Sequence, residues 1–240
     1  MCGRFVAAAT SDEIADVFDA QLGPDQATSP SWNIAPSRDI TTIRVVEGER
    51  AVKLHRWGLV PSWAKDPKIG ARMINARAET LAEKPAFRSA LRRKRCLIPA
   101  TGFYEWEHIA RTKRKQPFYI SPINGELLAF AGLWEYWRPD PERPEFLLSA
   151  TIITTEANED ISPLHNRMPL ILPADKWDQW LDPATQDSSA LTELMVTPSP
   201  GLLSLVPVSM EVNKVSNHGP HLIDPVDPGE DSELAGGSSA

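Results

Sequence analysis

Short runs of alternating apolar and polar residues occupy much of the chain and predict β-strands. Residues 40–46 and 51–57 form two such runs, and the Glu-Gly-Glu-Arg segment at 47–50 between them predicts a hairpin turn. Asn124-Gly125 is a second strong turn sequence. Further strands are predicted at residues 96–98, 103–107, 117–121, 127–137, 146–155 and 205–209.

Helical spacing marks four shorter segments. Thr10 and Glu13 form a capping box at the start of residues 10–22, where apolar side chains recur every three or four positions. Helices are also predicted at residues 85–93, 174–181 and 188–195. Because the strands follow one another through turns more often than they alternate with helices, we expect an α+β fold with an antiparallel, barrel-like β core and flanking helices. A doubly wound parallel sheet is not expected.

Composition places the chain among ordinary globular proteins. It has 240 residues, of which 42% are hydrophobic and 24% are charged, so one or at most two domains are expected. The sequence has no signal peptide and no long apolar run, which predicts a cytoplasmic protein. Two cysteines cannot form a disulfide framework. His218 and His221 lack the helix and the third ligand of a metal site, so no metal is expected. The sequence has no glycine-rich phosphate loop, so no nucleotide cofactor is expected either.

Charge is distributed unevenly along the chain. Residues 217–240 carry five of the acidic residues and no lysine or arginine, so residues 1–216 account for only −2 of the net charge of −7. We therefore expect a single domain over residues 1–216 and an acidic, disordered tail over 217–240. Two basic runs in the body could form one positive face or two separate solvated surfaces. They are Arg88, Arg92, Arg93, Lys94 and Arg95, and Arg111, Lys113, Arg114 and Lys115.

Cys2 is the first candidate for chemistry. Removal of Met1 would leave an α-amine and a thiol on this one residue. An α-amine has a pKa of about 7.7 to 8.0, against about 10.4 for lysine, so far more of it is neutral and nucleophilic near neutral pH. Such an amine condenses with an aldehyde to an imine, and the adjacent thiol can close onto the imine carbon as a five-membered thiazolidine. Alternatively, a cysteine at position 2 is incidental and frayed.

Seven sequence blocks favour a nucleophilic role for Cys2 over an incidental one. In chain order they are Cys2-Gly3-Arg4-Phe5, Trp32-Asn33-Ile34-Ala35-Pro36, Arg56-Trp57-Gly58-Leu59-Val60-Pro61-Ser62-Trp63, Asn75-Ala76-Arg77-Ala78-Glu79, Arg95-Cys96-Leu97-Ile98-Pro99, Gly102-Phe103-Tyr104-Glu105-Trp106 and His165-Asn166-Arg167-Met168-Pro169. Their succession closely resembles the SRAP family, the SOS response-associated peptidase proteins that shield abasic sites in single-stranded DNA. The resemblance extends from Cys2 to about Asn213.

The resemblance implies a role for each matching residue. Cys2 corresponds to the nucleophile that forms a covalent DNA adduct after loss of Met1, and Asn75 to an active-site amide that positions the terminal amine or the opened sugar. Glu105 corresponds to the proton shuttle, and His165 to the histidine that opens the abasic sugar ring. DNA contacts are expected from Arg4, Asn33, Trp63, Arg77, Trp106 and Arg167.

The expected partner is abasic single-stranded DNA, with the protein acting as a monomer that is cytoplasmic and nucleoid-associated when bound. Strand cleavage by β-elimination and autoproteolytic loss of Met1 are further activities that the resemblance allows. Two other functions stay open: an N-terminal-nucleophile cysteine peptidase or amidohydrolase, and a non-catalytic single-stranded DNA binding module. Cys96 is expected to be buried and inert. A core position is expected for Trp134, Trp137, Trp177 and Trp180.

Overall fold

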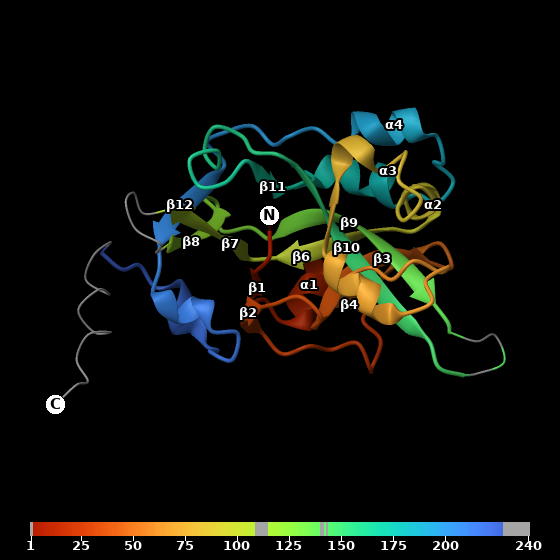
Figure 1. The fold of residues 1–240 in the computed structure, drawn as a ribbon, viewed down its shortest axis with the longest axis horizontal. Helices are drawn as coiled ribbons and strands as arrows, with labels where there is room; N and C mark the ends of the chain where they lie inside the picture. The colour runs from red at the N-terminus through yellow and green to blue at the C-terminus, as the bar shows by residue number, and fades with distance from the viewer. Residues whose placement is uncertain (1, 109–114, 140–141, 143, 228–240) are drawn as a thin grey trace.

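Two β-sheets form the centre of the protein, shown in Figure 1 as a computed structural model that describes residues 2–108, 115–139, 142 and 144–227. The first sheet is antiparallel, with strand order β12-β8-β7-β1-β2. Its strands are β1 (Phe5–Ala7), β2 (Ser31–Ile34), β7 (Gly102–His108), β8 (Lys115–Pro122) and β12 (Leu203–Pro207).

The second sheet closes into a barrel because β10 pairs with both β9 and β4. The barrel strands are β3 (Asp39–Val46), β4 (Glu49–Trp57), β6 (Arg95–Ala100), β9 (Leu128–Trp137) and β10 (Leu147–Glu156). Two short strands, β5 (Asn75–Arg77) and β11 (Arg167–Pro169), pair with the second half of β10. The predicted α+β fold with a barrel-like core is confirmed.

The barrel is mixed, which differs from the expectation of an antiparallel core. β10 runs parallel to β4 and to β5, whereas the other pairings of this sheet are antiparallel. Turn sequences determine the direction only of strands that are neighbours in the chain. β10 meets β4 and β5 after long excursions of the chain, so local turn chemistry did not predict their direction.

The helices pack into one hydrophobic core with strands of the barrel. They are α1 (Ser11–Val17), α2 (Arg88–Arg93), α3 (Trp177–Leu181) and α4 (Ser188–Glu193). Their buried residues pack with those of β3, β6 and β9 in one hydrophobic core, where the rings of Phe18 and Trp177 stack at 4.4 Å. Single turns of 3-10 helix complete the fold: η1 (Pro67–Arg72), η2 (Ala78–Thr80), η3 (Ala174–Lys176), η4 (Met210–Asn213) and η5 (Pro220–Ile223).

Local sequence explains where several elements begin and end. Thr10 and Glu13 make the predicted capping box of α1, but the helix ends at Val17, before the predicted Leu22, because Asp19 has a φ of 46°. In the β3–β4 hairpin, Glu47 and Gly48 have φ values of 53° and 90°. Two successive residues with positive φ make a tight turn that matches strand twist, so β4 begins at Glu49, two residues before the predicted start.

The first basic run does not form one positive face. Arg88, Arg92 and Arg93 of α2 are exposed, but Arg95 is buried and its guanidinium donates to backbone carbonyls, including that of Leu91 at 2.7 Å. Lys94 is half-buried and pairs with Glu135. In the second run, Arg111, Lys113 and Arg114 lie outside the described residues.

Part of the expected tail is ordered. Residues 217–227 are described: Leu222 of η5 is buried, and Val226 N–H donates to the carbonyl of Pro207 at the end of β12. Residues 217–227 are therefore packed against the domain, in contrast to the disorder predicted from Asn217 onward. Residues 228–240 lie outside the described part of the chain. Among the described residues, no helix has both the length and the apolar character needed to cross a membrane.

Candidate functional site

Cys2 lies at one end of the barrel, immediately before β1. It is fully buried in a hydrophobic core that includes Phe5, whose ring makes edge contacts with Trp57 at 5.3 Å and Phe130 at 6.1 Å. Burial raises the pKa of the Cys2 thiol well above its usual range, and the Glu105 carboxylate raises it further. The thiol is therefore protonated at neutral pH, and Glu105 lies close enough to influence it.

Asn75 binds Cys2 directly. It is the first residue of β5, which is held in parallel register against β10 with Asn75 opposite Ile152. Its side-chain Nδ2 donates a hydrogen bond to the backbone carbonyl oxygen of Cys2 at 2.8 Å. Its Oδ1 is buried and has no hydrogen-bond partner among the described residues. The amide thus holds the backbone of Cys2 and keeps one acceptor available beside it.

Glu105 approaches from the neighbouring sheet. β7 pairs with β1 with Phe103 opposite Phe5, and side chains alternate along β7, so Glu105 shares the face of Phe103 toward the core that contains Cys2. Only 3% of Glu105 is exposed. Burial raises the pKa of its carboxyl group above the ordinary value. A carboxyl group with a raised pKa is suited to accept and return a proton near neutral pH.

His165 lies in the loop between β10 and β11 and is half-buried. Its Nδ1 accepts a hydrogen bond from the backbone N–H of Arg167 at 2.9 Å, so the neutral ring carries its proton on Nε2. Burial lowers the pKa of His165, and the positive charges of Lys115 and Arg167 lower it further. The ring is therefore a neutral hydrogen-bond donor at Nε2 in physiological conditions.

The two arginines expected at the lesion differ in their availability. Arg77 is exposed and lies two residues after Asn75 on the same face of β5, and it makes no ion pair within the described ranges. Arg167 instead donates to both carboxylate oxygens of Glu79 at 2.8 and 3.0 Å, and to the carbonyl of Thr154 at 2.6 Å. Arg77 is the cation available to a phosphate, whereas Arg167 is already bound.

Arg4 and Asn33 join the two ends of the described chain. Arg4 Nη1 donates to Asn33 Oδ1 at 2.6 Å and to the carbonyl of Val212 at 2.8 Å. Asn33 is buried, and its Nδ2 donates to the carbonyls of Val212, Lys214 and Asn217 at 3.4, 3.2 and 3.0 Å. All hydrogen-bonding groups of this amide are used inside the protein, so the geometry gives Asn33 a structural role, not the expected contact with DNA.

The tryptophans divide in a way that the sequence did not show. Trp63 is 57% exposed, consistent with the expected surface role. Trp106 lies on the face of β7 opposite to Glu105, packs against the cluster around Tyr104, and donates from Nε1 to Asn213 Oδ1 at 2.7 Å. Its expected place beside the lesion is therefore not favoured by the structure.

The residues expected in the core are mostly there. Trp137, Trp177 and Trp180 are buried, as is Cys96. Trp134 is only half-buried, and the guanidinium of Arg44 covers one face of its ring. The sequence did not predict that Glu79 is the ion-pair partner of Arg167. It belongs to the block with Asn75 and Arg77, but its pairing with Arg167 joins residues 88 positions apart.

Among the residues that the structure describes, no three His, Cys, Asp or Glu side chains come together as a set of metal ligands. The groups that do converge are the Cys2 thiol, the Asn75 amide and the Glu105 carboxyl. Arg77 is on β5, which pairs with the second half of β10, and His165 is in the loop just before β11, which pairs there too. This combination can hold an amine, move a proton and bind an anion.

Comparison with known proteins gives consistent matches. The curated protein "Abasic site processing protein YoqW" of Bacillus subtilis is 43% identical over 225 residues, which cover 93% of this chain and 99% of the relative. "Abasic site processing protein HMCES" of Gallus gallus is 36% identical over 242 residues, covering 88% of this chain and 70% of the relative.

A solved structure from Bacteroides thetaiotaomicron has the same fold, with a TM-score of 0.83 at 23% identity over 94% of this chain and 100% of that protein. The family model described as "SOS response associated peptidase (SRAP)" matches residues 1–215. With this match and relatives above 30% identity over most of its length, the chain belongs to the SRAP family.

Proposed function

We propose that this protein processes abasic sites in single-stranded DNA by forming a thiazolidine between Cys2 and the abasic sugar after removal of Met1. The observation that carries the proposal is the 2.8 Å hydrogen bond from Asn75 to the Cys2 carbonyl, with the buried Glu105 carboxyl beside the thiol. Two relatives named "Abasic site processing protein" support the choice of substrate.

The reaction balances without an oxidant, a reductant or a metal. The α-amine of Cys2 adds to the aldehyde carbon of the ring-opened sugar, and the resulting carbinolamine loses water to give an imine. The thiol sulfur then adds to the imine carbon, and its proton is transferred to the nitrogen. One C–N bond and one C–S bond form, and one water molecule leaves. Because the Cys2 pKa is raised, the sulfur starts as a thiol and needs a base for this step.

Glu105 is suited to serve as that base. Its carboxylate can accept the proton that the amine loses on attack, return a proton to the departing hydroxyl, and relay the thiol proton to the nitrogen. The raised pKa of Glu105 makes both protonation states accessible during one reaction cycle. Asn75 fixes the backbone of Cys2, so the amine and the thiol approach the same carbon from a defined direction.

His165 and Arg77 would act on the substrate. The abasic sugar is mostly ring-closed, and opening moves the proton of the C1 hydroxyl through water to the ring oxygen. The Nε2–H of neutral His165 can donate a hydrogen bond that stabilises the charge developing on that oxygen. The exposed Arg77 can bind a phosphate next to the lesion, and exposed Trp63 can stack on a base. We further propose that the protein acts as a monomer and that the single domain expected over residues 1–216 extends to the packed residues 217–227.

A denaturing gel tests this function. Purified protein lacking Met1 is mixed with single-stranded DNA that carries one abasic site, and wild type is compared with Cys2→Ala and with Cys96→Ala as the matched control for a buried cysteine. We expect a heat-stable adduct with wild type and Cys96→Ala, and none with Cys2→Ala or with undamaged DNA. Absence of an adduct with wild type would overturn the proposal in favour of a hydrolase or a simple DNA-binding module.

A further inference from the structure

The end of the barrel away from Cys2 carries a group of cationic and aromatic side chains. Cys2 packs near Trp57, Phe130 and Ile152, which lie toward one end of their strands. At the other end, alternation along the strands places cationic and aromatic side chains on the face that points into the barrel mouth. These side chains are Arg44 on β3, Lys53 on β4, Lys94 next to β6, and Trp134 and Tyr136 on β9.

Cations and rings are already stacked at this mouth. The guanidinium of Arg44 lies over the ring of Trp134 at 4.0 Å, and Lys94 Nζ lies 5.7 Å from the same ring. Lys94 is neutralised by Glu135, but Arg44 has no acidic partner within ion-pair distance among the described residues, and its Nε is buried without a hydrogen bond. A half-buried guanidinium without an anion is an attractive position for a phosphate.

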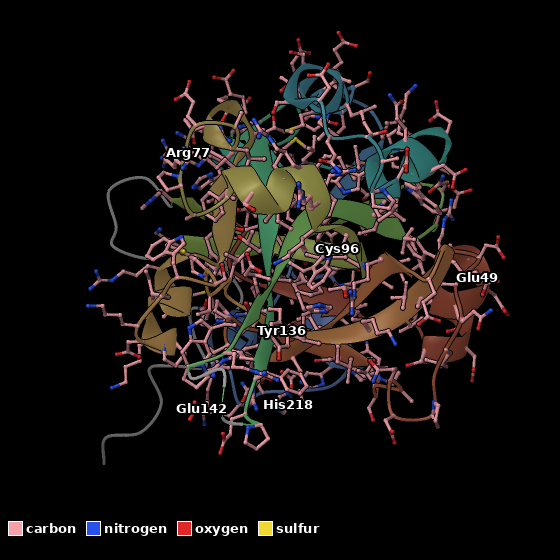
Figure 2. The ribbon with its side chains drawn as sticks, turned by 90° about the vertical axis from the view of Figure 1, so that its right-hand side faces the viewer. Glu49, Arg77, Cys96, Tyr136, Glu142 and His218 are labelled. Carbon is pink, nitrogen blue, oxygen red and sulfur yellow. The ribbon has the colours of Figure 1, made fainter. Side chains whose placement is uncertain are left out.

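Exposed aromatic rings extend the same surface. Tyr136 of β9 and Phe146, just before β10, stack at 5.4 Å with an interplanar angle of 23°, and they are 36% and 57% exposed. The guanidinium of Arg138 lies over Tyr136 at 5.7 Å. In Figure 2, Tyr136 lies in the lower half of the molecule and Arg77 near its top, so the two surfaces are separate.

We propose that this second surface, formed by Arg44, Trp134, Tyr136 and Phe146 and here called the far-mouth surface, binds undamaged single-stranded DNA. The exposed rings of Tyr136 and Phe146 offer faces on which a base can stack, and the unpaired guanidinium of Arg44 offers a partner for the backbone, which are the two features that such a ligand requires. A symmetric contact with a second copy of this chain would bring two unpaired Arg44 guanidinium groups together, whereas a nucleic acid supplies phosphates, so charge complementarity favours the nucleic acid. The exposed Glu142 and Glu145 lie in the adjoining loop, so stacking contributes more than charge on that side.

The far-mouth surface would extend the contact of a strand whose lesion lies at Cys2. Arg77 pairs with Thr154 on β10, whereas Leu148 of β10 lies opposite Tyr136. Six residues of strand separate Thr154 from Leu148, a distance of about 20 Å at about 3.3 Å per residue. A long strand can span both surfaces, but a short one at the lesion site cannot. This inference takes its ligand class from the proposed function.

Oligonucleotide length therefore separates the two surfaces experimentally. The double variant Tyr136→Ala with Phe146→Ala is compared with wild type for equilibrium binding of undamaged single-stranded DNA of about 20 nucleotides, longer than a typical site of about 4 to 16. We expect the variant to bind at least about fivefold more weakly, because each lost stacking contact is worth about 1 to 3 kcal/mol. Ile123→Ala with Leu202→Ala, which truncates two other exposed apolar side chains, should bind as wild type does.

A second readout keeps the inference distinct from the proposed function. Crosslinking to an abasic trinucleotide with the lesion in the middle should be equal for wild type and the double variant, because one flanking nucleotide cannot span the distance of about 20 Å to the far mouth. Equal binding of the long undamaged strand by both proteins would overturn the inference. So would concentration-dependent self-association of wild type that the double variant abolishes, because the surface would then be occupied by a second copy. Failure of wild type to crosslink would contradict the proposed function and leave the binding comparison valid.

Discussion

Asn75 donates its side-chain hydrogen bond to the backbone carbonyl of Cys2, not to the thiol. The bond joins the second residue of the chain to a three-residue strand that is itself held by β10. A residue so close to the chain terminus normally frays, because few contacts offset its conformational entropy. Here one amide links the position of Cys2 to the barrel, and the reactive geometry depends on that link.

Removing the amide should slow the reaction. Asn75→Ala loses the donor to Cys2, and we expect the rate of adduct formation to fall by about two- to tenfold, since a hydrogen bond contributes about 0.5 to 1.5 kcal/mol. Asn75→Asp keeps the shape but cannot donate, so it should be at least as slow. Single-turnover kinetics on gels measure both rates. An Asn75→Ala rate equal to that of wild type would show that the bond does not position the nucleophile.

Glu105→Gln should slow the reaction yet make the fold less sensitive to rising pH. Because the folded-state pKa of Glu105 is raised by burial, the folded protein holds this proton more tightly than the unfolded chain does. Stability of wild type is therefore lost as pH rises from the usual glutamate range through the raised pKa, where a buried charge forms. The neutral glutamine avoids that charge. Urea unfolding at several pH values should show that the free energy of unfolding of the variant increases relative to that of wild type as pH rises. A difference that does not change with pH would contradict the raised pKa of Glu105.

The two lesion-side arginines should make unequal contributions to DNA binding. Arg77 has no ion-pair partner among the described residues, so Arg77→Ala should weaken binding of single-stranded DNA and reduce the salt-dependence slope by about 0.7 for one lost phosphate contact. Arg167 is held by Glu79, so Arg167→Ala should change the slope less. Salt titrations of both variants measure this, and a larger slope change for Arg167→Ala would reverse the assignment.

Asn33→Ala should destabilise the fold. The substitution removes the buried amide that joins Arg4 to the carbonyls of Val212, Lys214 and Asn217. Leaving buried polar groups unsatisfied costs about 1 to 3 kcal/mol, and we expect a loss of that size in the free energy of unfolding. Chemical denaturation gives the value. Wild-type stability combined with weaker DNA binding would instead support the contact with DNA that the sequence suggested.

Local patterns in the sequence predicted most of the elements but few of the pairings. The capping box at Thr10 and the hairpin around Gly48 depend on neighbouring residues and appear as expected. The parallel pairing of β10 with β4 and β5 joins distant segments, and no turn between them specifies its direction.

The same limit applies to the candidate site. Motifs drew attention to Asn75 and Glu105, and the structure places both beside Cys2. The motifs did not reveal that Asn33 is saturated by carbonyls, or that Glu105 and Trp106 lie on opposite faces of β7. These facts depend on which face of a strand is covered by a remote segment, here residues 208–226, and a local pattern does not contain that information.

The mass of the DNA adduct tests the central claim most directly. Wild type and Cys2→Ser are each incubated with abasic single-stranded DNA, with and without borohydride, and the intact products are weighed by mass spectrometry. The account predicts a wild-type product that lacks Met1, equals protein plus DNA less one water, and persists without reduction, whereas Cys2→Ser, which has the amine but no thiol, yields a lasting product only after borohydride. A wild-type adduct that also needs borohydride, or one that retains Met1, would contradict thiazolidine formation at Cys2.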